Sequence, residues 1–203
     1  MSIPYELRGR THQKARTRNA LIAAARALLT EGVTPTVEHA ADRAAISRTT
    51  AYRYFQNQRA LLVATYPEID APSLLGADAP ADPLERLEAV ADHITRSILE
   101  HEPELRAQLR LSLEPTPPQP EALPFRQGRA IGWYEDALAP LRDRMTQAEL
   151  HRLALAIRAT TGIEALVWLT DIAGLSREEA VAIMRSSART LARSAIADGA
   201  TPD

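Results

Sequence analysis

The stretch that decides the fold is TVEHAADRAAISRTTAYRYF, which runs from Thr36 to Phe55. The spacing of its apolar residues predicts one short helix over residues 37–44 and a second over residues 47–55. The residues that would let these helices pack closely are small or apolar: Ala41, Ala44 and Ile46. Two short helices joined by a tight turn are typical of a helix-turn-helix.

In such a motif the second helix enters the major groove of DNA, with the residues near its N-terminus facing the bases. Ser47 can cap this helix, Arg48, Thr49 and Tyr52 would share its outer face, and Phe55 would point back into the core. Arg48 is the best candidate to read a base, because arginine can bond guanine O6 and N7 together. The alternatives are that Arg48 is an ordinary solvated charge and that Tyr52 and Tyr54 pack partly in the core.

Charge is distributed unevenly between the part of the chain that contains this stretch and the part that follows it. Residues 1–60 hold ten basic and four acidic residues, whereas residues 61–203 hold 14 basic and 22 acidic residues. The net charge of −2 therefore hides a head of +6 and a body of −8. A basic head suggests contact with a polyanion, although uneven surface charge alone would give the same count.

Helical periodicity continues along the chain, and no stretch shows sustained strand alternation. We therefore predict an all-α fold of about nine helices: a helix-turn-helix head over residues 1–60 and a helical bundle over residues 61–203. The further helices are expected over these ranges: 14–30, from 57, 83–101, 102–113, 125–145 with a bend at Pro140, 146–172 and 176–197. Residues 67–83 and the proline-rich residues 115–124 are expected to be connections.

Several classes of chemistry lack their usual residues. The chain has no cysteine, and its five histidines show no HxxH or HExxH spacing, so we expect no metal site. No glycine-rich phosphate loop, G-x-S-x-G or paired acidic motif is present, so we expect neither an enzyme nor a cofactor. We count no apolar run of about 18 residues and no secretory signal, which favours a cytoplasmic protein with no membrane partner.

The residues from Thr36 onwards resemble the DNA-binding region of the tetracycline-repressor (TetR) family of bacterial regulators. That family pattern is roughly T-x-x-x-I-A-x-x-A-G-V-S-x-x-x-[FL]-Y-x-[HY]-F-x-x-K-x-x-L. The matching positions are Thr36, Ala41, Ala44, Ile46, Ser47, Tyr52, Tyr54, Phe55 and Leu62 or its neighbour Leu61. The motif covers about the first 60 residues, and the helix count extends the resemblance over the rest of the chain.

The sequence departs from the pattern at four positions. Ala45 stands where the family has a turn glycine, so we expect a Cβ at a position that prefers positive φ. Ala40 and Ala51 replace larger residues and predict a thinner head core. Gln58 replaces a lysine that meets a phosphate, and a neutral amide releases no counterion.

The resemblance implies a role for each matching position. Expected phosphate contacts come from Thr36, Thr50, Tyr52, Tyr54 and Gln58, and expected base contacts from Arg48, Thr49 and Tyr52. Ser47, which caps the second helix, is counted with these DNA-binding residues. Lys14, Arg16 and Arg18 are expected to precede the first helix, either along the DNA backbone or minor groove or as a disordered basic tail.

In the family, the body dimerises through its last two long helices and binds a small ligand among the middle ones. Two apolar stripes fit such a dimer, one expected in the chain's own core and the other against a partner: Val181, Met184, Ala188, Leu191 and Ala195, and Ile157, Leu166, Val167 and Leu169. Polar or aromatic residues on apolar helices are the ligand candidates: His93, Arg110, Trp133, Tyr134, Arg158, Thr161, Glu164 and Trp168. Thr161, Glu164 and Trp168 are spaced to share one face, but ordinary core or dimer contacts are the alternative for all eight residues.

These features favour a ligand-responsive regulator, expected to be a repressor, that binds double-stranded DNA as a homodimer on a pseudo-palindrome and responds to an unidentified small molecule. The departures from the family pattern leave open an alternative. In that alternative the chain is a helical small-molecule binding protein whose head has lost DNA recognition.

Overall fold

A computed structural model describes residues 5–65, 71–113 and 128–198. Within these ranges the fold is all-α, with 75% helix and no strand, which confirms the predicted class of about nine helices. The proline-rich residues 115–124 lie outside the described residues, and residues 71–82 form the predicted connection without a helix. The chain divides into two compact units, which are described separately below.

The first unit comprises Met1–Ile69 and Pro103–Arg126, and the second comprises Asp70–Glu102 and Gln127–Asp203. This division differs from the boundary predicted at residue 60. Helix α4 (Gln58–Ala64) belongs to the first unit because Leu61 is fully buried in that unit's core. Most of helix α6 (Glu102–Leu113) also belongs there, since Ala107 and Leu111 pack against Leu29 and Leu62.

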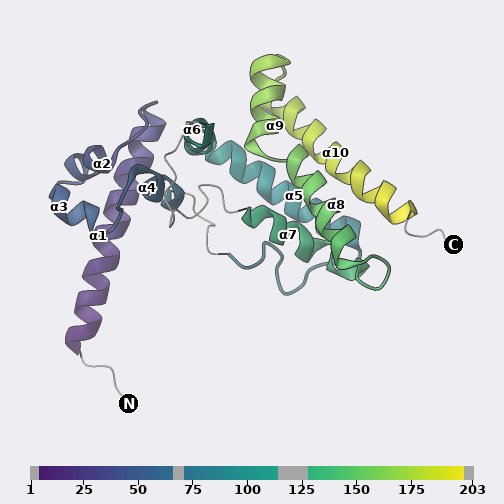
Figure 1. The fold of residues 1–203 in the computed structure, drawn as a ribbon, viewed down its shortest axis with the longest axis horizontal. Helices are drawn as coiled ribbons and strands as arrows, with labels where there is room; N and C mark the ends of the chain where they lie inside the picture. The colour runs from purple at the N-terminus through teal and green to yellow at the C-terminus, as the bar shows by residue number, and fades with distance from the viewer. Residues whose placement is uncertain (1–4, 66–70, 114–127, 199–203) are drawn as a thin grey trace. The chain divides into compact units, whose positions relative to one another are not determined.

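The first unit contains α1 (Tyr5–Thr30), α2 (Val37–Arg43), α3 (Arg48–Tyr52), α4 (Gln58–Ala64) and most of α6 (Glu102–Leu113) (Figure 1). Helix α1 begins nine residues before the predicted start at Lys14, and α3 ends before the predicted Phe55. The starts of the three short helices are set by Thr36, Ser47 and Asn57, whose side chains each accept a backbone N–H of the first turn.

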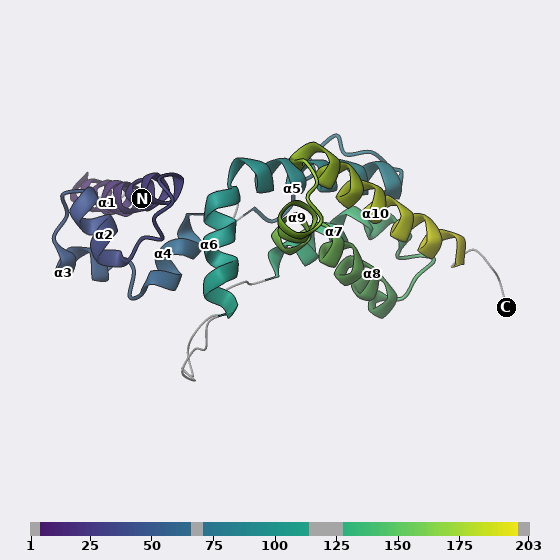
Figure 2. The ribbon, with the colours of Figure 1, turned by 90° about the horizontal axis from the view of Figure 1, so that it is seen from above.

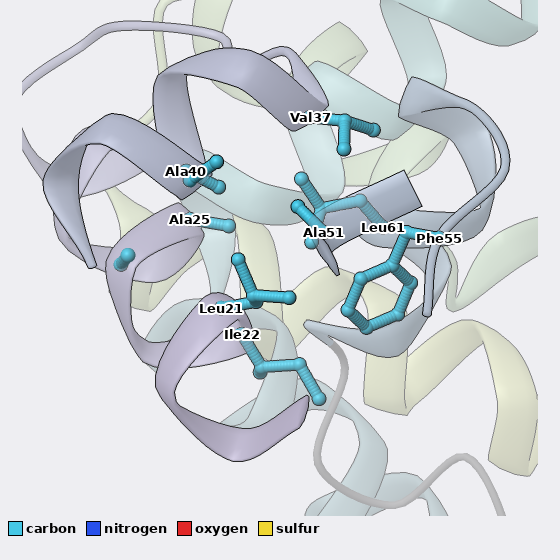
Figure 3. Close-up of a cluster of buried hydrophobic side chains, with 10 residues drawn as sticks. Leu21, Ile22, Ala25, Val37, Ala40, Ala51, Phe55 and Leu61 are labelled. Atoms are coloured by element: carbon cyan, nitrogen blue, oxygen red, sulfur yellow. The ribbon is translucent and has the colours of Figure 1, made fainter. Parts of the chain in front are cut away.

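The core of the head is built largely from small residues (Figure 3). Five of the ten buried residues in its main cluster are alanines: Ala24, Ala25, Ala40, Ala41 and Ala51. The larger side chains there come from α1, α2, α4 and the segment after α3, and they are Leu21, Ile22, Val37, Phe55 and Leu61. Small residues let helix backbones approach closely. The alanines of this core lie where α2 packs against α1 and α3.

The second unit contains α5 (Pro83–Glu100), α7 (Arg129–Ala137), the 3-10 helix η1 (Ala139–Leu141), α8 (Gln147–Thr160), α9 (Ile163–Val167), the π-helical segment η2 (Trp168–Ile172) and α10 (Arg177–Asp198). Its long helices form a closed set of neighbours, since α10 packs on α5 and α8, and α7 packs on the same two helices (Figure 1, Figure 2). Four mutually packed helices can bury one continuous apolar core.

Two helices predicted in this unit are interrupted. The helix expected over residues 146–172 breaks after Thr160, because Gly162 leaves the helical conformation with φ −92° and ψ 174°. The helix expected over residues 125–145 is shorter: α7 ends at Ala137, and Pro140 lies in the 3-10 turn that follows. Residues 125–127 lie outside the described ranges.

The stretch Gln147–Ile172 is long and apolar enough, by length and composition, to cross a membrane, with a mean hydropathy of 1.3. Its apolar residues are interrupted by polar ones, so it contains no continuous apolar run of the length expected for a membrane span. Of its most apolar window, 44% is buried inside the structure. A partly buried core helix of this kind passes the same test, so the feature is weak evidence of a membrane span.

Candidate nucleic-acid interface

The turn between α2 and α3 fixes the geometry of the motif. Among the residues that the structure describes, Ala45 is the one non-glycine residue with a positive φ, +54°. This confirms the strained position expected from the sequence. The N–H of Ile46 donates to Ala41 O at 2.9 Å, and the N–H of Ala45 donates to Asp42 O at 3.3 Å. These two bonds form a Schellman motif with alanine at the position that glycine usually takes.

Helix α3 is held at its start by two hydroxyl groups. Ser47 Oγ accepts the backbone N–H of Thr50 at 3.3 Å and donates to Thr50 Oγ1 at 2.9 Å. Ala51 is fully buried and anchors the inner side of the helix. The first turn of α3 therefore has a defined orientation although the helix has only five residues.

The predicted base-contacting residues lie on the outer side of α3. Arg48 and Thr49 are exposed, and Tyr52 keeps 41% of its surface exposed. Two acidic residues of α2 contact this face: Arg48 Nη2 lies 3.4 Å from Asp42 Oδ2, and the Tyr52 hydroxyl donates to Glu38 Oε1. The hydrogen bond lowers the pKa of the Glu38 carboxyl and raises the pKa of the Tyr52 hydroxyl.

The residues predicted to contact phosphates have different environments. Thr36 Oγ1 accepts the N–H of His39 at 3.2 Å as the cap of α2, and Thr50 is half-buried beside Ser47. Tyr54 is half-buried and packs on the head core, as the alternative for this residue anticipated. The Gln58 amide donates to Pro35 O at 2.9 Å, so its N–H group is engaged inside the head.

Basic residues of α1 lie next to this motif. Lys14, Arg16 and Arg18 belong to α1, so the expectation that they precede the first helix was wrong, and it also conflicted with the helix predicted over residues 14–30. The Arg18 guanidinium lies over the Phe55 ring at 5.6 Å from its centre, a cation–π contact. Arg16 lines a groove of 590 Å³ between α1 and the α2–α3 turn, together with His12, Ala44 and Ile46.

A second groove joins α1 to α3 and introduces a residue that the sequence analysis missed. It measures 470 Å³ and is lined by Gln13, Lys14, Thr17, Thr50, Arg53 and Tyr54. Arg53 is exposed and directly follows α3 as its C-terminal cap. The sequence pattern that could have indicated this residue is a basic side chain between two tyrosines, Tyr52 and Tyr54. Lys14, Arg53 and Thr50 thus give one groove two positive charges and a hydroxyl, a combination that suits a phosphate.

The predicted ligand residues are divided between the two compact units. Arg110 belongs to the first unit, where it is exposed and donates to Thr34 Oγ1. In the second unit Trp133 is buried and donates to Ala71 O at 2.8 Å, and His93 is half-buried on α5. Arg110 therefore belongs to a different compact unit from the other seven candidates.

Of the remaining five candidates, two form a hydrogen-bonded pair, two form an ion pair, and one is exposed. The buried Tyr134 hydroxyl donates to Thr161 Oγ1 at 2.7 Å, and Arg158 Nη1 lies 3.4 Å from Glu164 Oε2. Trp168 is 56% exposed whereas Thr161 is fully buried, so these two do not share the one face that their spacing suggested. The break after Thr160 and the π-helical turn at Trp168 change the helical register that the prediction assumed.

A pocket of 390 Å³ in the second unit is lined by other residues, all on α5 and α10: Glu88, Asp92, Ala182, Arg185, Ser186 and Arg189. Its charged groups are paired across the two helices, Arg185 with Asp92 and Arg189 with Glu88, each at 2.7 Å. Burial lowers the pKa of the Arg185 guanidinium, and the neighbouring Arg96 adds to the effect. These ion pairs join α5 to α10, and none of the predicted ligand residues lines this pocket.

The two apolar stripes predicted for dimerisation are largely internal. Val181, Met184 and Ala188 of α10 are buried, as are Ile157 of α8 and Leu166 of α9. The exposed large apolar residues of these elements are instead Leu155, Trp168, Ile172 and Ile183. The remaining stripe residues, Leu191, Ala195, Val167 and Leu169, are half-buried. The buried residues of the α10 stripe lie inside because α10 packs on α5 and α8 together, which a sequence pattern alone does not reveal.

Within the described ranges, no group of three or more histidine, aspartate or glutamate side chains is placed to hold a metal ion. Comparison of the chain with protein-family models and with curated proteins found no match. The likeness to the tetracycline-repressor family therefore rests on the motif residues of the sequence.

Proposed function

We propose that this chain is a sequence-specific DNA-binding transcriptional regulator whose helix α3 enters the major groove. The observation that carries the proposal is the geometry of α3. It is a short helix capped by Ser47 and fixed by the buried Ala51, with Arg48, Thr49 and Tyr52 on its open side. The major groove of B-DNA is wide enough for one α-helix, and each base pair shows a distinct pattern of donors and acceptors there.

The proposal assigns separate roles to the groups around α3. Arg48 would donate to guanine O6 and N7, and Thr49 and Tyr52 would contact neighbouring base edges. Lys14, Arg53 and the Thr50 hydroxyl would hold the sugar-phosphate backbone, since they line one groove beside the helix. Phosphate contacts fix the register of a protein on DNA, whereas base contacts give the sequence preference.

The proposal includes a homodimer that reads a pseudo-palindrome. Its support in the second unit is the set of exposed apolar residues Leu155, Trp168, Ile172 and Ile183 on α8, η2 and α10. Large exposed apolar side chains on neighbouring elements are typical of protein–protein contact surfaces. A two-fold dimer would present two copies of α3 to half-sites about one helical turn apart or a multiple of it.

Repression in the cytoplasm and release by a small-molecule effector complete the proposal, and both rest on the resemblance. The aromatic residues Trp133 and Tyr134 make their hydrogen bonds inside the second unit, so they are better placed as core than as ligand walls.

The test is selection of bound fragments from a random-sequence DNA pool by the purified protein, followed by Kd measurements across a salt series. The proposal expects an enriched pseudo-palindrome whose affinity falls steeply with salt. Arg48→Ala should weaken binding to that sequence by roughly 10- to 100-fold, which corresponds to one bidentate base contact of about 1–3 kcal/mol. Arg152→Ala, an exposed arginine on α8, is the matched control and should leave the Kd unchanged.

An unchanged Kd in Arg48→Ala, with an enriched sequence in hand, would refute the base-reading role of α3. Failure to enrich any sequence would favour the second candidate, a small-molecule binding protein with an inactive head. Two observations favour that candidate: the Gln58 amide is engaged by Pro35 O, and Ala45 strains the turn before α3.

A further inference from the structure

Two acidic residues of α2 face the surface of α3 that would read DNA. Glu38 and Asp42 are four residues apart, and so are Arg48 and Tyr52. Residues four apart lie on the same side of a helix. The structure pairs the two sides, Asp42 with Arg48 and Glu38 with Tyr52, so two successive contacts join α2 to α3.

We propose that Glu38 and Asp42 are specificity-determining residues, which suppress binding of α3 to DNA of arbitrary sequence by competing with phosphate for Arg48 and Tyr52. This inference rests on the proposed function. It concerns residues that neither the motif resemblance nor the charge count singled out, since both are acidic residues in a basic head.

The competition follows from the chemistry of Arg48. A guanidinium has five N–H donors, and Asp42 lies beside only one of its amino groups, Nη2. A guanine edge needs two donors and carries no net charge. Arg48 can therefore donate two N–H groups to guanine while another N–H group remains beside the Asp42 carboxylate. A phosphate bound by Arg48 would instead lie close to the carboxylate, and the repulsion of like charges would oppose that contact.

Tyr52 is restricted in a similar way. Its hydroxyl has a single hydrogen, which it donates to Glu38, so it has no hydrogen left to donate to a phosphate oxygen. Its half-exposed ring remains available for apolar contact with a thymine methyl group. The acidic pair therefore directs both α3 residues from phosphate towards base edges.

The experiment compares the full-length wild-type chain with Asp42→Asn, Glu38→Gln and the double variant. Each is titrated with a random-sequence duplex and with the sequence that the wild type enriches, over a salt series. We expect the double variant to bind the random duplex roughly ten-fold more tightly at low salt, with a salt slope steeper by about 0.9 for each added phosphate contact. Affinity for the enriched sequence should change by less than about three-fold, so the ratio of specific to random affinity falls.

The matched control is Glu31→Gln. It removes one carboxylate from the same head, but that carboxylate pairs with Arg43 rather than with a residue of α3. It should raise random-duplex binding less than Asp42→Asn and leave the specificity ratio unchanged. Circular dichroism establishes that each variant is folded, which is expected because all these side chains reach solvent.

Two results would overturn the inference while leaving the proposed function intact. One is a random-duplex Kd that Asp42→Asn and Glu38→Gln do not lower. The other is an equal rise in affinity for the random-sequence duplex in Glu31→Gln and Asp42→Asn, which would show a general charge effect. If the wild type enriches no sequence at all, the proposed function fails, and the specificity role of the acidic pair fails with it.

Discussion

The head and the body of this chain use their polar side chains in different ways. In the first unit Arg48, Thr49 and Tyr52 lie on an exposed face above a core that is half alanine. In the second unit the fully buried Tyr134 and Thr161 bond to each other at 2.7 Å. Exposed polar groups can exchange their partners with solvent or with a bound molecule, whereas buried donors must be satisfied internally because an unpaired buried polar group is costly.

The contrast also concerns stability. Because the head core contains five alanines, most of its buried area comes from a few larger residues such as Phe55 and Leu61. The second unit has larger apolar residues on every long helix, including Leu87, Leu150 and Met184. We therefore expect the head to depend more heavily on individual side chains than the body does.

The largest expected effect tests this dependence. Phe55→Ala should destabilise the head by about 3–5 kcal/mol, because it removes the aromatic ring from an otherwise small core. Hydrogen exchange followed by mass spectrometry should show faster exchange in α1 to α4 and less change in α8 and α10. Leu150→Ala is the matched variant in the body, and it should give the reverse pattern. Equal exchange changes in both units for both variants would remove the distinction between them.

A second pair of variants compares the tyrosines of the two units. Tyr134→Phe should destabilise the second unit by about 1 kcal/mol, because Thr161 loses a buried donor while its own bond to Ile157 O remains. Tyr52→Phe should hardly change the thermal midpoint, because its hydroxyl bonds to Glu38 at the surface. The comparison fails if Tyr52→Phe lowers the midpoint as much as Tyr134→Phe does.

The turn before α3 offers a variant of opposite sign. Ala45→Gly should stabilise the head by roughly 0.5–1 kcal/mol, since relief of left-handed strain outweighs the entropy that glycine adds to the unfolded chain. Ala44→Gly is the adjacent control at an ordinary φ of −84°, and it should destabilise the head. Denaturant unfolding measures both. A loss of stability in Ala45→Gly would show that the strain at this turn is negligible.

The smallest effect concerns carboxyl pKa values. Hydrogen bonds from Thr146 lower the pKa of Glu149, so its contribution to stability is present above the ordinary glutamate pKa and is lost as pH falls through the lowered value. NMR titration of Thr146→Ala should show the Glu149 pKa returning upwards while that of Glu179, lowered by Ser176, stays low. In the head, Tyr52→Phe should raise the Glu38 pKa alone. A Glu149 pKa unchanged in Thr146→Ala would exclude the cap as its cause.

The sequence predicted those features that depend on hydrogen bonds between close neighbours. Asp82 accepts the N–H groups of Leu84 and Glu85 and starts α5 beside Pro83, as expected. Thr146 and Ser176 start α8 and α10 through their capping boxes with glutamate. The positive φ at Ala45 was predicted from the same local pattern. Each of these features involves partners no more than about five residues apart.

Contacts between distant residues decided the rest. The bond of Gln108 to Leu62 O, 46 residues away, helps to place α6 with the head, and with it Arg110. The Tyr134–Thr161 bond spans 27 residues and accompanies the break after Thr160 that separates Thr161 from Trp168. Periodicity shows that a helix has an apolar face but not what covers it. The sequence therefore determined the starts of the helices that have side-chain caps and the order of the motif, while tertiary packing decided which side chains were buried and which remained exposed.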